Sequence, residues 1–555
     1  MSNRSIQSIS SDTNNATLAT KPSYIKQRLT FLPFLTLIFV LIAAALINYN
    51  YSNRLDIISD DDDLYFSFGM MLLEGKYRGA DDGPLYYAFQ LLLQLITNDA
   101  IKTFYINYII TSTVPFILLY LLLRGRNINI WIAAIITIMF MFSSLNYPVT
   151  PKLTHYAIVF LLLGLLAFTY CKDLTHKLST CCFFVFLAAY ARPELYIAFF
   201  LLYAVTGYVC LREKKLRYVF LMLSITIICG YFLGTPIGER DRSFWTFKHH
   251  FSINYIESNP QLNLSPWNHF NQITTNAFGH KLVSIKDAII TNPVLVFWHI
   301  KLNIIHYIKI IPSYFADIIF NNIQFPFRKY VILFFGFLLA IRTDYQKSYE
   351  NIVLGFRQNL VFIIIFLLML APTYISNFFI YPRTHYILYH FFLYMYLFAM
   401  LCNCVAFKKI SLKRNWLADY AAIGFSILII SLLYISQYKE SAQFKPLPSK
   451  EFSLMLRNCK LKGKISALGG DAPFSYNRYV GQNWSFNYYD IIRPERFDKC
   501  IVDYKVNCVI INDKMNSYFA SDSTYKLFLN HPELIGFVLV KKTKTHQVYA
   551  KHEGI

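Results

Sequence analysis

Apolar residues along this chain gather into long runs that short polar stretches separate. Runs of roughly 16 to 23 apolar residues are long enough for a helix to cross the hydrocarbon core of a bilayer, which is about 30 Å thick. Such runs predict eleven membrane spans, at residues 29–47, 104–123, 130–146, 155–171, 178–191, 195–211, 216–234, 329–341, 360–376, 385–407 and 417–436. The chain is therefore expected to be an α-helical polytopic membrane protein.

Two apolar segments allow a second interpretation. Residues 293–312 carry two histidines and two lysines, which favours a helix lying in the membrane interface over a span. The first run contains Ala43–Ala45, which could mimic the cleavage site of a signal peptide, but the run is long for that purpose. We therefore expect the first run to remain as a span.

Composition supports a membrane protein and changes how the net charge is interpreted. The 555 residues are 55% hydrophobic and only 15% charged, whereas soluble domains carry about 25% charged residues. A net charge of +21 can indicate nucleic-acid binding. Here, however, Lys and Arg cluster between the apolar runs, so we expect the lipid bilayer as a partner and no nucleic acid.

The distribution of Lys and Arg predicts the orientation of the chain. Alternate loops, at residues 124–129, 172–177, 212–215, 342–359 and 408–416, each hold two or more basic residues. By the positive-inside rule these loops are cytoplasmic. Residues 1–28 then form a disordered cytoplasmic N-terminus, and residues 29–436 form the transmembrane domain with outer loops 48–103 and 235–328. Because eleven is an odd number, residues 437–555 are expected outside an inner or plasma membrane.

The polar tail differs from the rest of the chain. Short β-like runs at Gly463–Gly470, Val506–Asp513 and Ile535–Lys542 alternate with helix-compatible stretches, which predicts a small extracytoplasmic α/β domain. Three cysteines lie in it, Cys459, Cys500 and Cys508. Two of them could form a disulfide outside the cytoplasm, but the pairing cannot be derived from the sequence. We expect this domain to cap or support the membrane part.

Four consecutive aspartates, Asp60–Asp63, directly follow the first span. Adjacent carboxylates repel one another, which raises some of their pKa values or recruits a cation. A solvated acidic turn is the simplest interpretation. The following residues, LYFSFGMMLLEG, have apolar positions at helical spacing and end in Gly75, which predicts an interfacial helix. A Gly-Pro-Leu-Tyr-Tyr turn at residues 83–87 then returns the chain towards the membrane.

This outer loop resembles the first external loop of the GT-C superfamily, polytopic glycosyltransferases that use polyprenyl-phosphate sugars. Within that superfamily it is similar to the protein mannosyltransferase and aminoarabinose transferase group. Asp61 and Asp62 precede Tyr65 as in an Asp-Asp/Glu-x-x-Tyr element. ARPELY at residues 191–196 and YPRTHYILY at residues 381–389 resemble two further elements at helix junctions. The chain departs from the pattern by having no Asp-x-Glu at residues 147–154.

The resemblance implies transfer of a sugar from a polyprenyl phosphate to a lipid, glycan or protein acceptor, with inversion. Such a reaction needs a base for the acceptor hydroxyl and cations for the leaving phosphate. Asp61 or Asp62 is the candidate base, with Asp60 and Asp63 not excluded. Arg192 and Arg383, with Lys152 as a weaker candidate, would bind the phosphate. A divalent ion, Mg²⁺ or Mn²⁺, held by the four aspartates remains open.

Each cation also has a structural explanation. Arg192 could pair with Glu194 at a helix end, and Arg383 could be an interfacial anchor among tyrosines. Lys152 could be an ordinary interface residue.

The outer loop 235–328 contributes a second group of charged and aromatic residues. Glu239 and Asp241 lie among arginines, and could face the acidic loop. His249 and His250 could bind a metal or the acceptor, but adjacent residues point in different directions, so structural roles are favoured. Tryptophans in this loop suit sugar stacking and suit a membrane-interface belt equally well.

Two other classes of protein compete with the glycosyltransferase hypothesis. An O-antigen or polysaccharide polymerase or ligase also has many spans and a large outer loop with Arg and His. It has no need of an acidic cluster after the first span. A transporter is disfavoured because the charges lie at span ends and no internal repeat is visible.

Overall fold

The computed structural model describes most of the chain. The described residues are 24–57, 61–76, 79, 83–147, 149, 152–235, 242–320, 337, 340–407, 424, 427, 428, 431, 447–469, 477–481, 483–487 and 496–551; of these, the side chains of 24–32, 61–63, 242, 477 and 478 are not described.

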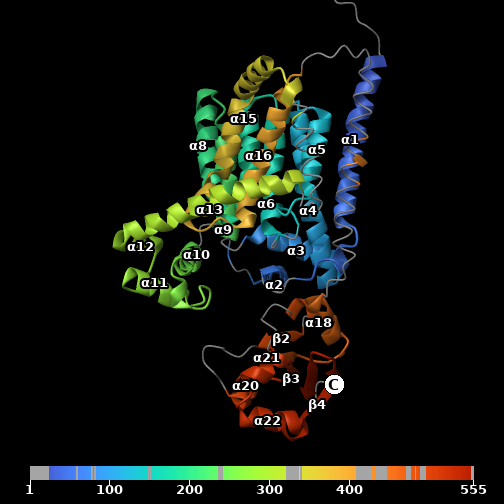
Figure 1. Cartoon of the computed structure of the whole chain (residues 1–555), viewed down its shortest axis with the longest axis vertical. Helices are drawn as coiled ribbons and strands as arrows, with labels where there is room; N and C mark the ends of the chain where they lie inside the picture. Colours follow the sequence, from blue (N-terminus) through green and yellow to red (C-terminus); the bar gives the residue numbers. More distant parts are fainter. Residues whose placement is uncertain are drawn as a thin grey trace, which may run out of the picture.

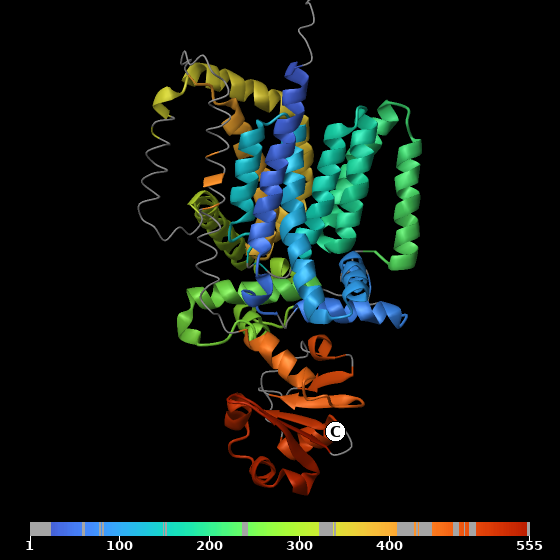
Figure 2. The same ribbon diagram turned by 90° about the vertical axis from the view of Figure 1, so that its right-hand side faces the viewer.

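Long helices form a bundle with their axes roughly aligned (Figures 1 and 2). Its members are α1 (Tyr24–Asn48), α4 (Ala100–Gly125), α5 (Ile130–Met141), α6 (Leu153–Tyr170), α7 (Leu174–Ala191), α8 (Tyr196–Arg212), α9 (Arg217–Leu233), α15 (Tyr345–Phe379) and α16 (Thr384–Cys404). Side chains near the helix starts fix several boundaries. Asp99 accepts hydrogen bonds from the backbone of Ile101 and Lys102 at the start of α4, and Asp344 caps α15 in the same way.

The predicted polytopic helical architecture is present, but the number of spans differs. Among the described residues, eight helices are long and apolar enough to cross a membrane. Two predicted spans, 130–146 and 216–234, appear as the shorter apolar helices α5 and α9. The predicted spans 329–341 and 417–436 lie almost entirely outside the described residues. The expected count of eleven is therefore not established.

The segment expected to lie in the interface is a single helix, α13 (Pro293–Phe320), which continues past Pro312. Its length and composition would allow it to cross a membrane. Figures 1 and 2 show that it runs across the bundle, at a steep angle to the other long helices.

Shorter helices cover one end of the bundle, opposite the end at which α1 begins (Figure 1). From the first outer loop come α2 (Asp61–Leu73) and α3 (Pro84–Thr97); from the second come α10 (Arg242–Ser258), α11 (Phe270–Phe278) and α12 (Ile285–Thr291). The 3-10 turns η1 (Tyr51–Asn53), η3 (Pro193–Leu195) and η4 (Pro260–Leu262) lie in the connecting segments. The helix predicted in the acidic loop is present, and its first turn already contains Asp61–Asp63.

The C-terminal domain, residues 448–551, lies beyond the same end (Figures 1 and 2). Its five-stranded mixed sheet has the order β2-β1-β3-β5-β4. The strands are β1 (Ile465–Gly469), β2 (Trp484–Asn487), β3 (Cys508–Ile511), β4 (Phe537–Lys542) and β5 (Gln547–Lys551). The helical elements are α18 (Pro448–Arg457), α19 (Asn477–Val480), α20 (Phe497–Asp503), α21 (Asp513–Tyr518), α22 (Ser523–Asn530) and η6 (Pro532–Ile535).

The central strand β3 is buried on both faces of the sheet, which explains its continuous apolar sequence CVII. On β3, Cys508 and Ile510 join one core cluster while Val509 and Ile511 join another. The three predicted strands correspond to β1, β3 and β4; the sequence analysis missed β2 and β5. All ten cysteines fall among the described residues and all are free thiols, so the disulfide considered for the tail is not formed.

Candidate functional site

The two halves of the first outer loop meet at the junction between α7 and α8. Gly83 precedes α3 with φ of 79°, in the left-handed region that favours glycine. A Cβ at this position would lie 2.3 Å from the carbonyl oxygen of Ala191. Only glycine therefore lets α3 approach the end of α7 this closely. The Gly-Pro turn is a packing requirement that brings the acidic loop to the predicted phosphate-binding junction.

Tyrosines fill the space between α2 and α3. The ring of Tyr65 on α2 lies 5.2 Å from that of Tyr86 and 5.7 Å from that of Tyr87, both on α3. All three side chains are buried. Tyr65 also lies within electrostatic reach of Arg192. Since Asp61 precedes Tyr65 by one helical turn, about 6 Å along the axis, the start of α2 lies near this junction.

Arg192, which follows α7 directly, is only 7% exposed. Its Nε donates to Glu194 Oε1 at 2.7 Å, and its guanidinium lies 5.1 Å from the ring centre of Tyr386. The ion pair considered from the sequence is therefore present. Nη2 is buried and makes no hydrogen bond to any described residue. Burial disfavours the charge, but Glu194 and the surrounding tyrosines more than compensate and raise the pKa of Arg192 well above its usual value.

Arg383 lies at the start of α16, on the far side of the same junction. Its guanidinium lies 5.4 Å from the ring centre of Trp267, which the second outer loop supplies. Two residues further on, His385 lies within electrostatic reach of Arg192, Arg383 and His250. The structure thus brings together two of the predicted phosphate ligands, although 191 positions separate them in the sequence.

A polar network fixes α10, the helix that carries His250. Asn254 donates to Asn303 Oδ1 at 2.8 Å and lies 2.9 Å from His299 Nδ1. Asn303 in turn donates to the carbonyl oxygens of Phe378 and Ile380, where α15 ends. These buried side chains satisfy carbonyls that a helix end leaves without partners. They lock α10 and α13 onto the membrane helices.

His249 and His250 differ in their surroundings. His250 is 1% exposed and lies against the rings of Trp267 and Tyr381. Burial, with the positive charge of Arg383, lowers the pKa of His250 to about 3. The ring is therefore neutral at neutral pH. His249 packs on Phe270, with 3.9 Å between ring centres, and the two histidines do not share a ligand position.

Lys152 is the third predicted phosphate ligand and is almost fully buried. Its Nζ donates to the carbonyl oxygen of Asn146 at 2.6 Å and lies 3.3 Å from His155 Nε2. The ring of Tyr108 lies 4.1 Å from the same atom. His155 connects Lys152 to the junction, because His385 lies within electrostatic reach of His155.

We name the cationic cluster after its lysine and two arginines, Lys152, Arg192 and Arg383; it also includes the rings of His155, His250 and His385. Tyrosine and tryptophan rings surround it, and Glu194 is the acid that pairs with it among the described residues. Two of its members are guanidiniums, which have the chemistry to hold a planar or tetrahedral anion such as phosphate, and one has a buried N–H group without a partner among the described residues.

The acidic partners of this site are described only in part. The backbone places Asp61 and Asp62 in the first turn of α2, where the helix dipole favours carboxylates. Their side chains lie outside the described atoms, as do Asp60, Glu239 and Asp241 altogether. No three His, Cys, Asp or Glu side chains in the described part gather to hold a metal. A fit to Mg²⁺ or Mn²⁺ rests on Asp60–Asp63, whose side chains lie outside the described atoms.

Sequence reasoning missed two parts of the site. His385 stands inside the YPRTHYILY motif, two residues after Arg383, and that spacing could have suggested it. Asn254, His299 and Asn303 gave no signal because their role depends on the packing of α10, α13 and α15.

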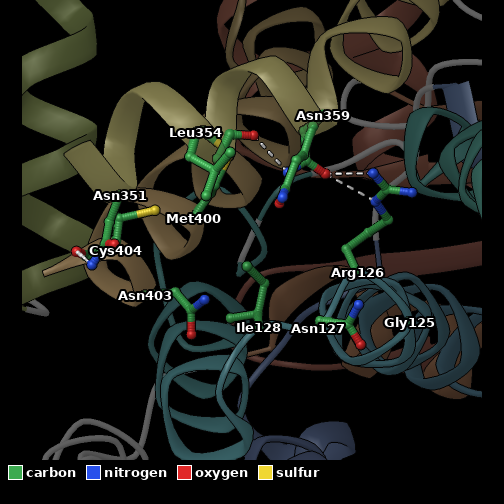
Figure 3. A pocket seen from close by; sticks show the side chains of 12 residues that line it. Gly125, Arg126, Asn127, Ile128, Asn351, Leu354, Asn359, Met400, Asn403 and Cys404 are labelled. Carbon is green, nitrogen blue, oxygen red and sulfur yellow. Dashed lines mark hydrogen bonds between the residues drawn. The ribbon is translucent and has the colours of Figure 1, made fainter. Parts of the chain in front are cut away.

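A separate cavity lies at the opposite end of the bundle (Figure 3). It has a volume of about 340 Å³ and lies between the ends of α4 and α16 and the first part of α15. Arg126 reaches across it to Asn359, which also accepts from Tyr396. This cavity shares no residue with the cationic cluster.

Compared with known proteins, the chain matches no family model and no curated protein.

Proposed function

We propose that this chain is a membrane glycosyltransferase that transfers a sugar from a polyprenyl-phosphate donor to an acceptor hydroxyl. One observation carries the proposal. Arg192, a buried arginine with one N–H group that has no hydrogen-bond partner among the described residues, lies within electrostatic reach of Tyr65. Tyr65 lies one helical turn after the aspartates of α2, so the first turn of α2, which carries the candidate base, lies near the candidate phosphate site. The resemblance of the loop to that of GT-C enzymes supports the same assignment.

The chemistry follows from this arrangement. The carboxylate of Asp61 or Asp62 accepts the proton of the acceptor hydroxyl, while the oxygen of that hydroxyl attacks the anomeric carbon. The bond from that carbon to the phosphate oxygen breaks, and its electrons remain on the phosphate. Arg192 and Arg383 stabilise this charge, because both stay protonated at every physiological pH. Attack from the face opposite the leaving group inverts the configuration.

The surrounding side chains have supporting roles. His250 is neutral, so it offers a hydrogen bond without adding a further charge. Trp267 and Tyr386 cover the guanidiniums, which limits access of water and strengthens their attraction for phosphate. If an ion is held by Asp60–Asp63, it would neutralise part of the departing phosphate.

The test uses the full chain reconstituted in vesicles with radiolabelled polyprenyl-phosphate sugars. We expect transfer by the wild type and a loss of at least about a hundredfold in Asp61→Asn/Asp62→Asn, since general-base catalysis contributes about 10²–10⁴-fold. Glu74→Gln is the matched control: this exposed carboxylate follows the other end of α2 and forms a salt bridge with exposed Lys76. Full activity in the double variant refutes the assignment of the base.

A polysaccharide polymerase or ligase is the second candidate. The placement of His250 beside Arg383 favours it, because the large second outer loop would then carry the site. In that case polyprenyl-phosphate monosaccharides give no transfer, and a His250→Asn variant loses activity while the aspartate variant keeps it.

A further inference from the structure

One aromatic side chain of the C-terminal domain is buried in the first outer loop. Tyr479 is fully buried, and its ring lies 5.6 Å from Phe66 on α2 and 6.2 Å from Phe104 on α4, both edge-to-face. It belongs to a core cluster whose other fully buried members all come from residues 51–108. The domain therefore completes the core beneath the acidic helix.

An arginine holds this tyrosine in place. Arg457, at the end of α18, donates from Nε to the carbonyl oxygen of Tyr479 at 2.6 Å. The same guanidinium binds both carboxylate oxygens of Asp99, at 2.9 and 3.4 Å. Asp99 also caps α4 through Ile101 and Lys102. One arginine thus fastens the segment that carries Tyr479 to the start of a membrane helix.

A second contact fixes the other end of α18. Asp56, which follows α1, accepts hydrogen bonds from the backbone N–H groups of Ser449 and Lys450 at 2.8 and 2.9 Å. The N–H groups in the first turn of a helix have no acceptor within the helix, so a residue of the outer loop serves as the cap of a helix in the C-terminal domain. With both ends of α18 anchored, the domain has a fixed position against the loop.

We propose that Tyr479 is a positioning residue for α2: through Phe66 it holds the helix whose first turn carries Asp61 and Asp62. Phe66 lies four and five positions after these aspartates, so a shift of the ring moves the whole short helix. The C-terminal domain is then part of the catalytic unit. The catalytic consequence rests on the proposed glycosyltransferase function, whereas the mechanical coupling does not.

Hydrogen exchange in the full-length protein tests the coupling without any substrate. In Tyr479→Ala, we expect amides of residues 61–73 to exchange at least about tenfold faster than in the wild type, because α2 loses its main contact with the domain. Tyr479→Phe keeps the ring and should match the wild type. Tyr518→Ala is the control: this tyrosine is partly buried against the domain's other core cluster, away from α2.

Exchange in β3 shows whether the C-terminal domain itself stays folded. If the amides of β3 lose protection from exchange in Tyr479→Ala, the same measurement is made on Arg457→Gln. This variant removes the contacts of Arg457 with Tyr479 and Asp99 without opening a cavity. Faster exchange in α2 with β3 still protected supports the proposal. Unchanged exchange in α2, in whichever variant keeps β3 protected, overturns it.

Transfer assays add the catalytic consequence. For Tyr479→Ala we expect kcat to fall about tenfold or more with a smaller change in donor KM, because the ring touches no substrate site. A loss confined to KM contradicts a positioning role. If the wild type transfers no sugar at all, the proposed function fails, and the exchange experiment still decides the coupling.

Discussion

Arg192 and Arg126 lie at opposite ends of the bundle and are treated differently by their surroundings. Arg192 is buried, pairs with Glu194 and keeps one buried N–H group free of any described partner. Arg126 is only half-buried, lines an open cavity and gives two of its donors to the single amide oxygen of Asn359. Its guanidinium also covers the ring of Phe362.

The difference supports the proposal that Arg192 binds an anion, whereas Arg126 braces the ends of neighbouring helices. The amide oxygen of Asn359 accepts the hydrogen bonds that Arg126 donates. Arg126 needs no carboxylate to balance its charge, because it is only half-buried and solvent reaches this end of the bundle. A buried guanidinium costs far more to hold and is retained when it meets a countercharge. Arg192 has one carboxylate and a spare donor, which leaves room for a second anion.

Replacing the buried arginine is expected to have the largest effect. Arg192→Gln leaves Glu194, whose side chain is 21% exposed, without its cation, so stability should fall by about 3 kcal/mol. Transfer should fall by about 10²–10³-fold, as when one donor to a developing oxyanion is lost. Denaturant titration and transfer assays measure the two effects. The double variant Arg192→Gln/Glu194→Gln distinguishes two roles of the arginine. If the arginine binds phosphate, the double variant should regain stability but not transfer activity; recovery of both would show that the arginine is purely structural.

Gly83→Ala tests the close approach of α3 to α7. The new Cβ would meet the Ala191 carbonyl oxygen at 2.3 Å, so the backbone must shift, and we expect a loss of about 3 kcal/mol or more. Gly75→Ala is the matched control, because Gly75 also has positive φ but has nothing within 4 Å of the added atom. Similar thermal stability of the two variants would show that the contact is unimportant.

The pH dependence of stability tests the burial of His250. Its pKa in the folded protein is about 3, below the ordinary value of 6.5. As pH falls below 6.5 the unfolded state takes up a proton that the folded state does not, so stability decreases until the pH approaches 3. Between pH 6.5 and 5 the loss is about 2 kcal/mol. His250→Asn should flatten the unfolding free energy over this window; an unchanged slope would contradict the assignment.

Arg126→Gln gives the smallest expected effect. It removes hydrogen bonds to Asn359 at a half-exposed site, so we expect about 1 kcal/mol of lost stability and no change in transfer. A large loss of transfer would contradict the contrast between the two ends and would bring the cavity beside Arg126 into the mechanism.

Sequence patterns predicted the elements better than their assembly. Apolar run length identifies most long helices, and the acidic helix was recognised from its spacing, although α2 begins earlier, at Asp61. Strands β2 and β5 were missed because WSFN and QVYAK are too short to show alternation.

The sequence pointed to single candidate residues but not to their clustering. Arg192 and Arg383 stood out through their motifs, yet their proximity depends on the packing of α7 against α3 and of α16 against its neighbours. His250 reaches them only because Asn254 ties α10 to α13. Such buried polar contacts link residues that are far apart in the sequence, and they produce no periodic pattern from which they could be predicted.

The cap that Asp56 supplies to α18 also constrains the order of events during synthesis. Asp56 and Ser449 are 393 positions apart. At roughly 5–20 residues per second, the ribosome needs on the order of 20 to 80 s to make the intervening chain. The first outer loop must therefore wait for its partner, and meanwhile Phe66 and Phe104 lack the ring of Tyr479 that packs against them. A chaperone that shields such aromatic residues would have that interval in which to act, and a chain stopped before Pro448 would never leave that vulnerable stage.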